Sequence, residues 1–172
     1  MHVPCFLPIA LNPKISPHTM KHLLLIPALI VYLTSSVTGQ SVFGPQQVIT
    51  TAAVGAYSVY ATDLDGDGDA DVLSASYWDS KIAWYENTGG STFGPQQVIT
   101  TAADNAASVY ATDLDGDGDA DVLSASFYDD KIAWYENTGG GTFGPQQVIT
   151  TAANGAQSVY ATDLDGDGDA DV

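Results

Sequence analysis

The sequence predicts an all-β array of repeated units, and three observations support this fold class. From Phe43 onward the sequence repeats with a period of 50 residues, which is typical of propellers and other repeat arrays. Each repeat contains short segments rich in β-branched and aromatic residues, separated by turns that contain Gly, Asn and Asp. Nothing after Gln40 has the spacing of an amphipathic helix. We therefore expect a series of small antiparallel sheets.

Four short strands are expected in each repeat. In the first repeat they are Gln46–Thr50, Ser58–Thr62, Val72–Ser76 and Lys81–Glu86. Small residues alternate with large ones along these segments, which suits sheets that stack closely face to face. We expect Trp84 and its counterpart Trp134 to fill the space between such sheets.

The repeats are close copies of one another. Phe43–Thr92 and Phe93–Thr142 differ at seven positions, and the third copy covers residues 143–172. The repeat region is therefore predicted to cover residues 40–172 as one domain. About two and a half units of four strands are expected.

Each repeat contains the decapeptide Asp-Leu-Asp-Gly-Asp-Gly-Asp-Ala-Asp-Val, which begins at Asp63, Asp113 and Asp163. Five carboxylates within nine residues repel one another unless a cation neutralises them. Alternate residues of a tight loop point inward, so loop positions 1, 3, 5 and 9 offer carboxylates and position 7 offers its backbone carbonyl. Gly68 stands at position 6, where the chain turns sharply. The alternative interpretation is a solvated acidic turn without a metal.

A hard divalent cation, Ca²⁺, fits this all-oxygen set best, with about one ion in each repeat. The loop is not an EF-hand, because position 12 is Ser74 instead of Glu and the flanking segments are strand-like. The predicted ligands are Asp63, Asp65, Asp67, Asp69 and Asp71, then Asp113, Asp115, Asp117, Asp119 and Asp121, and then Asp163, Asp165, Asp167, Asp169 and Asp171.

Composition and charge exclude several classes of function. The chain has 21 acidic residues and 4 basic ones, with a net charge of −17, so binding to nucleic acid is not expected. All three histidines and the one cysteine lie in the first 22 residues. The repeats therefore lack the residues for a Ser-His-Asp triad, a Cys-His pair or a His/Cys zinc site. No catalytic constellation remains, and we expect a protein that is not an enzyme.

The N-terminal residues have the pattern of a secretory signal. Residues 1–19 show no periodicity and are expected to be an unstructured extension upstream of a second start at Met20. Residues 20–39 contain a short basic segment, an apolar run of 11 residues and a small polar end before Gln40. A membrane anchor is the alternative, but 11 apolar residues are too few to span the ~30 Å of hydrocarbon in a bilayer. We expect a signal peptide and a secreted or cell-surface protein.

The motifs Phe43-Gly44-Pro45, the Asp63–Asp71 loop and the run Trp84–Gly94 resemble FG-GAP repeats of the VCBS type, which also build the β-propeller of integrin α subunits. The resemblance covers residues 43–172. It implies that each repeat corresponds to one four-stranded propeller blade and that calcium lies in the loop between the first two strands of a blade. The ligand positions that it implies are the fifteen aspartates given above, with Asp69 and its two counterparts acting through their carbonyls.

The family's propellers usually have seven blades, whereas about two and a half are expected here. Three explanations stay open: the sequence is a fragment, several chains assemble into a closed ring, or the units form a short open array. The third calcium site is expected to be the weakest.

The loops opposite the acidic loops are the candidate ligand face. Six of the seven differences between the first two repeats fall there, and binding residues are often carried on loops. Neutral drift after duplication is the alternative. The candidate contact residues are the aromatics Tyr57, Tyr77, Trp78, Phe127 and Tyr128, with Asp79, Asp129 and Asp130 as polar partners.

The function expected from these features is that of a calcium-stabilised interaction or adhesion module, with an extracellular protein or a glycan as its partner. The alternatives are a carbohydrate-binding lectin and a non-catalytic accessory domain of a longer secreted hydrolase or lyase. Self-assembly or further blades are expected to close the propeller. No membrane span is expected in the mature chain.

Overall fold

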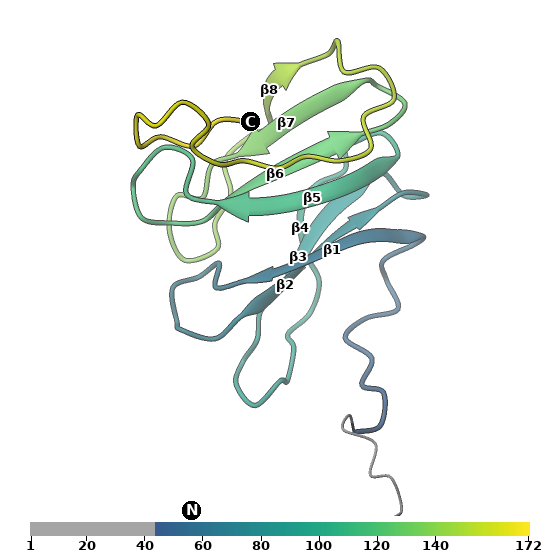
Figure 1. Cartoon of the computed structure of the whole chain (residues 1–172). Helices are drawn as coiled ribbons and strands as arrows, with labels where there is room; N and C mark the ends of the chain where they lie inside the picture. The colour runs from purple at the N-terminus through teal and green to yellow at the C-terminus, as the bar shows by residue number, and fades with distance from the viewer. Residues whose placement is uncertain (1–43) are drawn as a thin grey trace, which may run out of the picture. The chain divides into compact units, whose positions relative to one another are not determined.

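Eight β-strands form two four-stranded antiparallel sheets in the computed structural model, which describes residues 44–172 (Figure 1). The first sheet contains β1 (Ala56–Thr62), β2 (Asp71–Ser76), β3 (Lys81–Tyr85) and β4 (Gln97–Thr100) in this order. The second sheet contains β5 (Ala106–Thr112), β6 (Asp121–Ser126), β7 (Lys131–Tyr135) and β8 (Gln147–Thr150). Within this range there is no helix, which confirms the all-β prediction. The two sheets are the expected propeller blades. The predicted upstream extension and signal peptide lie outside the described residues.

The fourth strand of each blade comes from the next sequence repeat. β4 and β8 pair with β3 and β7 of the preceding repeat. The strand predicted at Gln46–Thr50 is the counterpart of β4, but it is not formed. A strand needs a neighbour for its backbone hydrogen bonds, and the described residues contain no sheet before the first repeat. The expectation that one repeat supplies all four strands of its own blade is therefore corrected.

Each blade has two different apolar faces. We call the leading face of a blade the one that packs on the preceding blade, and the trailing face the one that the next blade covers. The trailing face of the first blade carries Leu64, Leu73, Ala75, Ile82 and Trp84, and the leading face of the second blade carries Ala106, Val109, Ala111, Val122 and Tyr135. These ten residues form one buried cluster, and the close contact of two sheets explains why small residues alternate with large ones.

The prediction that Trp84 packs in the core is confirmed, because its side chain is 3% exposed. Trp134 holds the same position on the second blade but is only half-buried. The difference arises because a full blade covers Trp84, whereas Trp134 meets only the third repeat.

The third repeat adds one chain segment to the trailing face of the second blade. Val159 and Ala161 pack against Leu123 and Ala125 there. No strand forms between residues 151 and 172, although Thr162 and Asp171 make a single antiparallel bridge. This segment covers the second blade less completely than the second blade covers the first.

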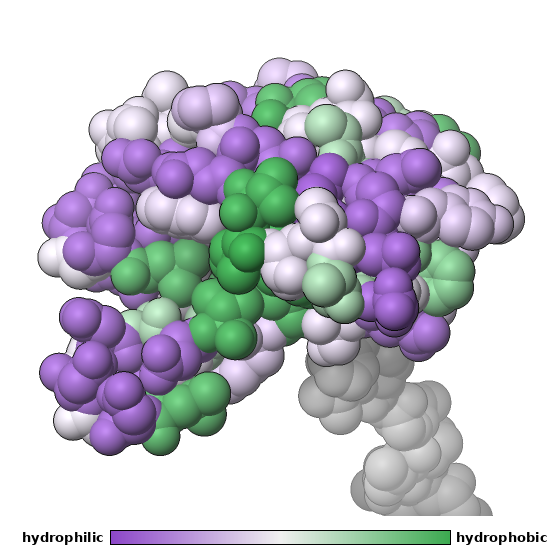
Figure 2. Space-filling view, turned by 90° about the horizontal axis from the view of Figure 1, so that it is seen from above, coloured by the Kyte–Doolittle hydropathy of each residue, from purple (hydrophilic) through white to green (hydrophobic). Residues whose placement is uncertain are grey.

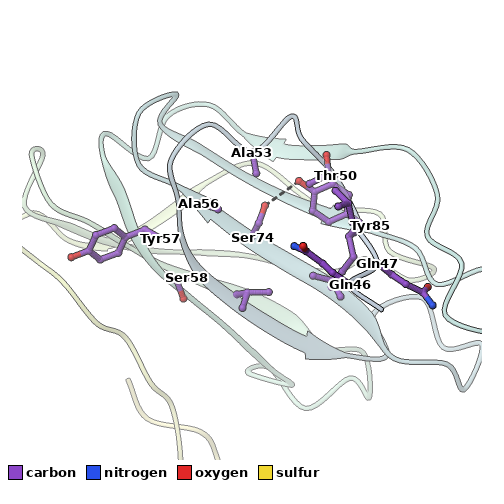
Figure 3. A pocket seen from close by; sticks show the side chains of 13 residues that line it. Gln46, Gln47, Thr50, Ala53, Ala56, Tyr57, Ser58, Ser74 and Tyr85 are labelled. Atoms are coloured by element: carbon purple, nitrogen blue, oxygen red, sulfur yellow. Dashed lines mark hydrogen bonds between the residues drawn. The ribbon is translucent and has the colours of Figure 1, made fainter. Parts of the chain in front are cut away.

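Among residues 44–172, no blade covers the leading face of the first blade. Val59 is 69% exposed, whereas its counterpart Val109 in the second blade is 4% exposed. A pocket of about 390 Å³ lies over this face, lined by β1 and β2 residues and by the segment that contains Gln46 and Gln47 (Figure 3). At its floor the Ser74 hydroxyl and the Tyr85 hydroxyl lie 3.3 Å apart and form a hydrogen bond (Figure 3).

Candidate functional site

The three acidic loops lie on one side of the repeat region, at the left in Figure 1. Two of them connect the first two strands of a blade, β1 to β2 and β5 to β6, as the resemblance implied. The third leads into the bridge between Thr162 and Asp171. Seen from above in Figure 2, hydrophilic side chains cover much of this side and also lie across other parts of the face.

The first aspartate of each loop fixes the backbone around itself. Asp63 accepts hydrogen bonds from the backbone N–H of Gly66 (2.8 Å) and of Gly68 (2.9 Å). Both glycines have positive φ, 80° and 93°, which glycine adopts without steric cost. The same bonds recur at Asp113 and Asp163. The local sequence therefore folds each loop into a ring around its carboxylates.

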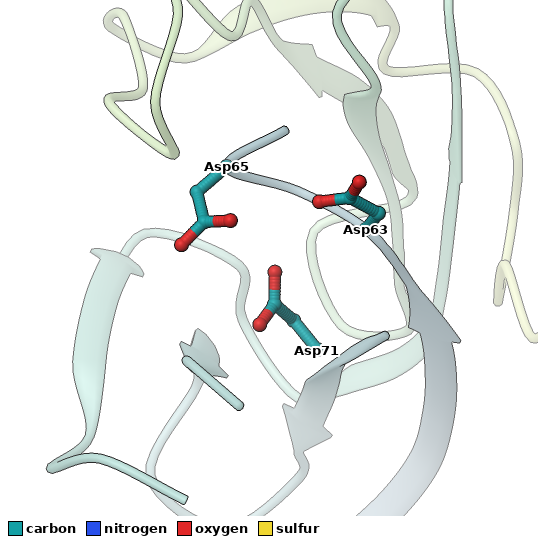
Figure 4. Close-up of side chains that lie close together, drawn as sticks. All are labelled: Asp63, Asp65 and Asp71. Carbon is teal, nitrogen blue, oxygen red and sulfur yellow. The ribbon is translucent and has the colours of Figure 1, made fainter. Parts of the chain in front are cut away.

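Three carboxylates converge in every loop. In the first loop, Asp63, Asp65 and Asp71 each offer an oxygen within 4.8 Å of the other two, and their side chains point toward one another (Figure 4). The corresponding groups are Asp113, Asp115 and Asp121, and Asp163, Asp165 and Asp171. The third group is fully exposed, whereas the first two each include one buried member.

The buried member is held in place by backbone donors. Asp71 and Asp121 are 0% exposed. Asp71 accepts hydrogen bonds from the N–H of Leu64 (2.9 Å) and of Asn87 (2.7 Å). Asp121 accepts the equivalent pair, at 3.0 and 2.7 Å. Each oxygen of a carboxylate has two lone pairs, so these bonds orient the group and leave capacity for a cation.

Burial, with a smaller effect of neighbouring charges, raises the pKa of two of these carboxyl groups. Burial raises the pKa of Asp121, its two backbone hydrogen bonds lower it, and the charges of Asp115 and Asp117 raise it further. Burial likewise raises the pKa of Asp65. Without a counter-charge, the ionised forms of Asp65 and Asp121 are therefore disfavoured in the folded protein, and a cation bound beside them would reverse this effect.

The oxygen atoms fit a calcium ion. Ca²⁺ binds oxygen at about 2.3–2.6 Å, so two ligands of one ion are separated by no more than about 5 Å. The 4.8 Å limit within each group satisfies this condition. The donor set contains oxygen alone, which suits Ca²⁺ or Mg²⁺ better than zinc. The groups therefore have the chemistry and the spacing of a site for a hard divalent cation.

Two further predicted ligands lie outside the converging group. Asp67 accepts a hydrogen bond from the N–H of Asp69 at 2.8 Å, and both residues are exposed. The side chain of Asp69 faces Gly89, where a Cβ atom would lie 3.8 Å from its Oδ2. Only the backbone carbonyl of Asp69 was predicted to act as a ligand, and an exposed side chain agrees with that role.

An asparagine that links neighbouring blades was missed at the sequence level. Asn137 is 0% exposed, and its Nδ2 donates to the carbonyl of Leu64 (2.8 Å) in the acidic loop of the first blade. It also donates to the carbonyl of Ala120 (3.1 Å) in its own blade. Asn87 lies in the Trp84–Gly94 run that carries the family resemblance, and neither Asn87 nor Asn137 was predicted to contact another blade. Their constant spacing of 16 residues after Asp71 and Asp121 was the available signal.

The opposite loops carry a row of aromatic side chains. Tyr57, Trp78 and Tyr128 are 64%, 74% and 66% exposed. The half-buried rings of Tyr77 and Phe127 connect them. Ring centroids are 5.5 Å apart for Tyr57 and Tyr77, and 5.2 Å for Tyr77 and Trp78. Across the blades Tyr77 and Phe127 are 6.4 Å apart, and Phe127 lies 5.6 Å from Tyr128. The structure thus brings together all five aromatic residues that were predicted to contact a ligand.

The three predicted acidic partners on this face already have contacts within the chain. Asp79 and Asp129 form ion pairs with Lys81 (2.9 Å) and Lys131 (2.6 Å). Asp130 accepts a hydrogen bond from the N–H of Gly155 at 2.8 Å. These contacts tie the loops to the sheets.

Of the comparisons with known proteins, the match to a family model agrees with the repeat structure. A search of the curated proteins finds no match. Among solved structures, the chain is similar to a lectin from Agrocybe aegerita described as recognising non-reducing terminal N-acetylglucosamine, with 24% identity and a TM-score of 0.44. That match covers 56% of this chain and 25% of the lectin. In the part that the structure describes, no helix is long and apolar enough to cross a membrane. The FG-GAP-like repeat family matches residues 63–124 and 113–172. The chain therefore belongs to the FG-GAP-like repeat family.

Proposed function

We propose that this protein is a secreted, calcium-stabilised interaction module. The observation that carries the proposal is the convergence of three carboxylate oxygens within 4.8 Å in each of the three acidic loops. Bound Ca²⁺ would supply positive charge to carboxylates whose repulsion otherwise opposes folding. FG-GAP-like repeats typically form non-catalytic modules, and the proposed calcium is structural.

Calcium binding is tested by isothermal titration of the metal-free chain with CaCl₂, with MgCl₂ as the matched control. We expect sites with a Kd of about 10⁻⁴–10⁻³ M, the range of extracellular calcium modules. We also expect the exposed third loop to bind most weakly, because water competes for its three ligands. In a variant, Asp63, Asp65 and Asp71 are replaced with Asn, and we expect it to bind fewer calcium ions. If this variant binds as many calcium ions as the wild type, the proposal is contradicted.

Secretion follows from residues 20–39, which lie outside the described residues. The test is to express the full chain in a secreting host and to determine the N-terminus of the protein in the medium. We expect the mature protein to begin at Gln40. Retention of the whole chain in the cells would count against secretion.

The aromatic row is the proposed contact surface for a protein partner. Exposed aromatic side chains make large contacts at a small cost in conformational entropy. The row also extends across both blades, since Tyr77 and Phe127 are neighbours. Sugar recognition needs several free polar groups beside the rings, but Asp79, Asp129 and Asp130 are engaged within the chain. A protein surface therefore suits this face better than a glycan.

Binding is measured on immobilised extracellular-matrix proteins and on a glycan array. The variant replaces Trp78 and Tyr128 with Ala. The control replaces Tyr160 with Ala, because Tyr160 is 62% exposed and lies outside the row. We expect the double variant to lose binding to a matrix protein at least about tenfold and the control to keep it. Equal binding by both variants would remove the surface from consideration, and binding to the glycan array alone would favour the lectin alternative.

A further inference from the structure

The leading face of the first blade is an open copy of a face that is buried elsewhere in the same chain. Val59 and Val109 hold equivalent positions on the two leading faces but are 69% and 4% exposed. Ala56 is exposed, whereas its counterpart Ala106 is buried. The second blade thus shows what covers such a face, namely the trailing face of another blade.

The trailing face of the second blade is covered incompletely. Ile132 and Trp134 remain half-buried against the third repeat. Their counterparts Ile82 and Trp84 are 0% and 3% exposed against a full blade. In the covering segment itself, Leu164 is 73% exposed. A complete blade in this place would therefore bury more apolar surface than the third repeat does.

The segment seated on this trailing face is nearly identical in sequence to the start of the first blade. Residues 43–72 and 143–172 differ only at Val54/Asn154 and Tyr57/Gln157. A surface that accepts one segment has the shape to accept the other. When residues 56–72 of a second copy replace residues 156–172 on this trailing face, β3 and β4 of that copy follow. They cover the rest of the face.

Hydrogen-bonding groups at the two open faces match as well. Asn137 donates to the carbonyl of Leu64 across the contact between the blades (2.8 Å). The Nδ2 of Asn87, its counterpart in the first blade, donates only to the carbonyl of Ala70 (3.1 Å) within the described residues. Leu114 is the counterpart of Leu64 in the second acidic loop. In a contact between two copies, the side-chain amide of Asn87 in one copy can therefore donate to the Leu114 carbonyl of the other.

A second pair repeats the same relation. The N–H of Val109 donates to the Ser58 hydroxyl of the preceding blade at 3.3 Å. The N–H of Val159 makes the same bond to Ser108. In a second copy, the N–H of Val59 is the equivalent donor for Ser108. The residues that define the two faces carry no charge, although the second acidic loop lies beside the contact through Leu114.

We propose that copies of this chain associate head to tail, with the leading face of the first blade of one copy on the trailing face of the second blade of another. Residues 156–172 leave that trailing face when the second copy binds. Such a contact joins two different surfaces, so repetition of it produces a ring or an open array. This inference goes beyond the proposed function and does not depend on any ligand of the aromatic row.

Sedimentation equilibrium of the full chain in excess CaCl₂, over a wide range of protein concentrations, tests the association. We expect the average mass of the wild-type chain to rise above the monomer mass of 17.9 kDa. The variant Val59→Asp places a charge on the open leading face, and we expect the dissociation constant to rise at least about tenfold. Because Val59 is already exposed, the melting temperature of the monomer should not change.

The matched control is Val98→Asp. Val98 lies on β4, and its counterpart Val148 stays 52% exposed although the first blade covers the leading face of the second. This position therefore stays outside contacts between blades. The control has the same charge as Val59→Asp and should associate like the wild type. A wild-type chain that stays monomeric, or equal association of the two variants, would overturn the proposal.

Hydrogen exchange detected by mass spectrometry provides a second readout on the wild-type chain. On association, the amides of residues 56–62 should gain protection and those of residues 156–162 should lose it. The Tyr57/Gln157 difference gives the two peptides different masses, so they can be followed separately. Protection that stays unchanged in both segments while the mass rises would show that association uses another surface.

Discussion

Replacing Asp121 with Asn tests whether the converging carboxylates hold calcium. Asp121 is buried, and its oxygens accept from the N–H groups of Asn137 (2.7 Å) and Leu114 (3.0 Å). An amide keeps one acceptor oxygen and puts an NH₂ group against the other donor, which costs about 1–3 kcal/mol. The same change removes a buried charge whose pKa is raised, which is favourable in the metal-free protein. These two effects oppose each other, so the change in metal-free stability is expected to be small.

The calcium-dependent stability is the decisive quantity. At a free calcium concentration about 100 times the Kd, one site adds about 2.7 kcal/mol to the free energy of unfolding. For a repeat region of this size, each kcal/mol raises the melting temperature by about 3–5 °C. Asp121→Asn should therefore lose about 10 °C of the increase that calcium gives the wild type, provided that the second loop limits unfolding.

The matched control is Asp119→Asn, which makes the same charge change in the same loop. The backbone carbonyl of Asp119 is its proposed ligand, and the substitution leaves that carbonyl in place. Melting curves of the three proteins are recorded by circular dichroism in EDTA and in excess CaCl₂. If the two variants lose equal parts of the calcium-dependent increase, the buried carboxylate is not a ligand, and the reasoning from the converging group fails.

Three further changes test the packing of the blades by urea unfolding. Asn137→Ala should lower the free energy of unfolding by about 1–3 kcal/mol more than Asn87→Ala, because only the former leaves a carbonyl of the neighbouring blade without its donor. Gly55→Ala should destabilise by more than about 1 kcal/mol, and by more than Gly155→Ala. Both glycines have positive φ, but only at Gly55 would a Cβ overlap a tryptophan ring, whereas at Gly155 it would lie 3.4 Å from a phenylalanine ring. Burial raises the pKa of Tyr110 from 10.0 to about 12, so the stability that it contributes is complete below pH 10 and is lost as the pH rises towards 12. Tyr110→Phe should therefore keep its urea midpoint over this range better than the wild type; a parallel decline in both would contradict the assignment.

Much of the fold follows from periodicity in the sequence. The bounds predicted for the strands Val72–Ser76 and Lys81–Glu86 lie within one residue of those of β2 and β3. Their β-branched and aromatic residues favour strands that pack between two sheets. The turns of the acidic loop could also be predicted, since its aspartates and glycines determine the local backbone conformation by themselves.

The repeat alone did not predict which strands belong to which blade. A period gives the length of the unit but not the point at which one sheet ends and the next begins. That point depends on whether Gln97–Thr100 pairs with β3 before it or with β5 after it, and this is a tertiary choice. The link from Asn137 to the carbonyl of Leu64, 73 positions apart, was hidden for the same reason, because it arises only when two blades stack.

The boundaries of the sequence repeats and of the blades do not coincide, because the fourth strand of each blade belongs to the next repeat. This offset has a consequence for anyone who shortens or extends this gene. A protein cut after Thr92, at the limit of a repeat, loses the outermost strand of its last sheet, whereas one cut after Thr100 keeps it. Recombination between the near-identical repeats adds or removes 50 residues wherever the crossover falls, and each such event changes the number of strands by four. The register of the sheets is thus preserved through genetic expansion and contraction of the array.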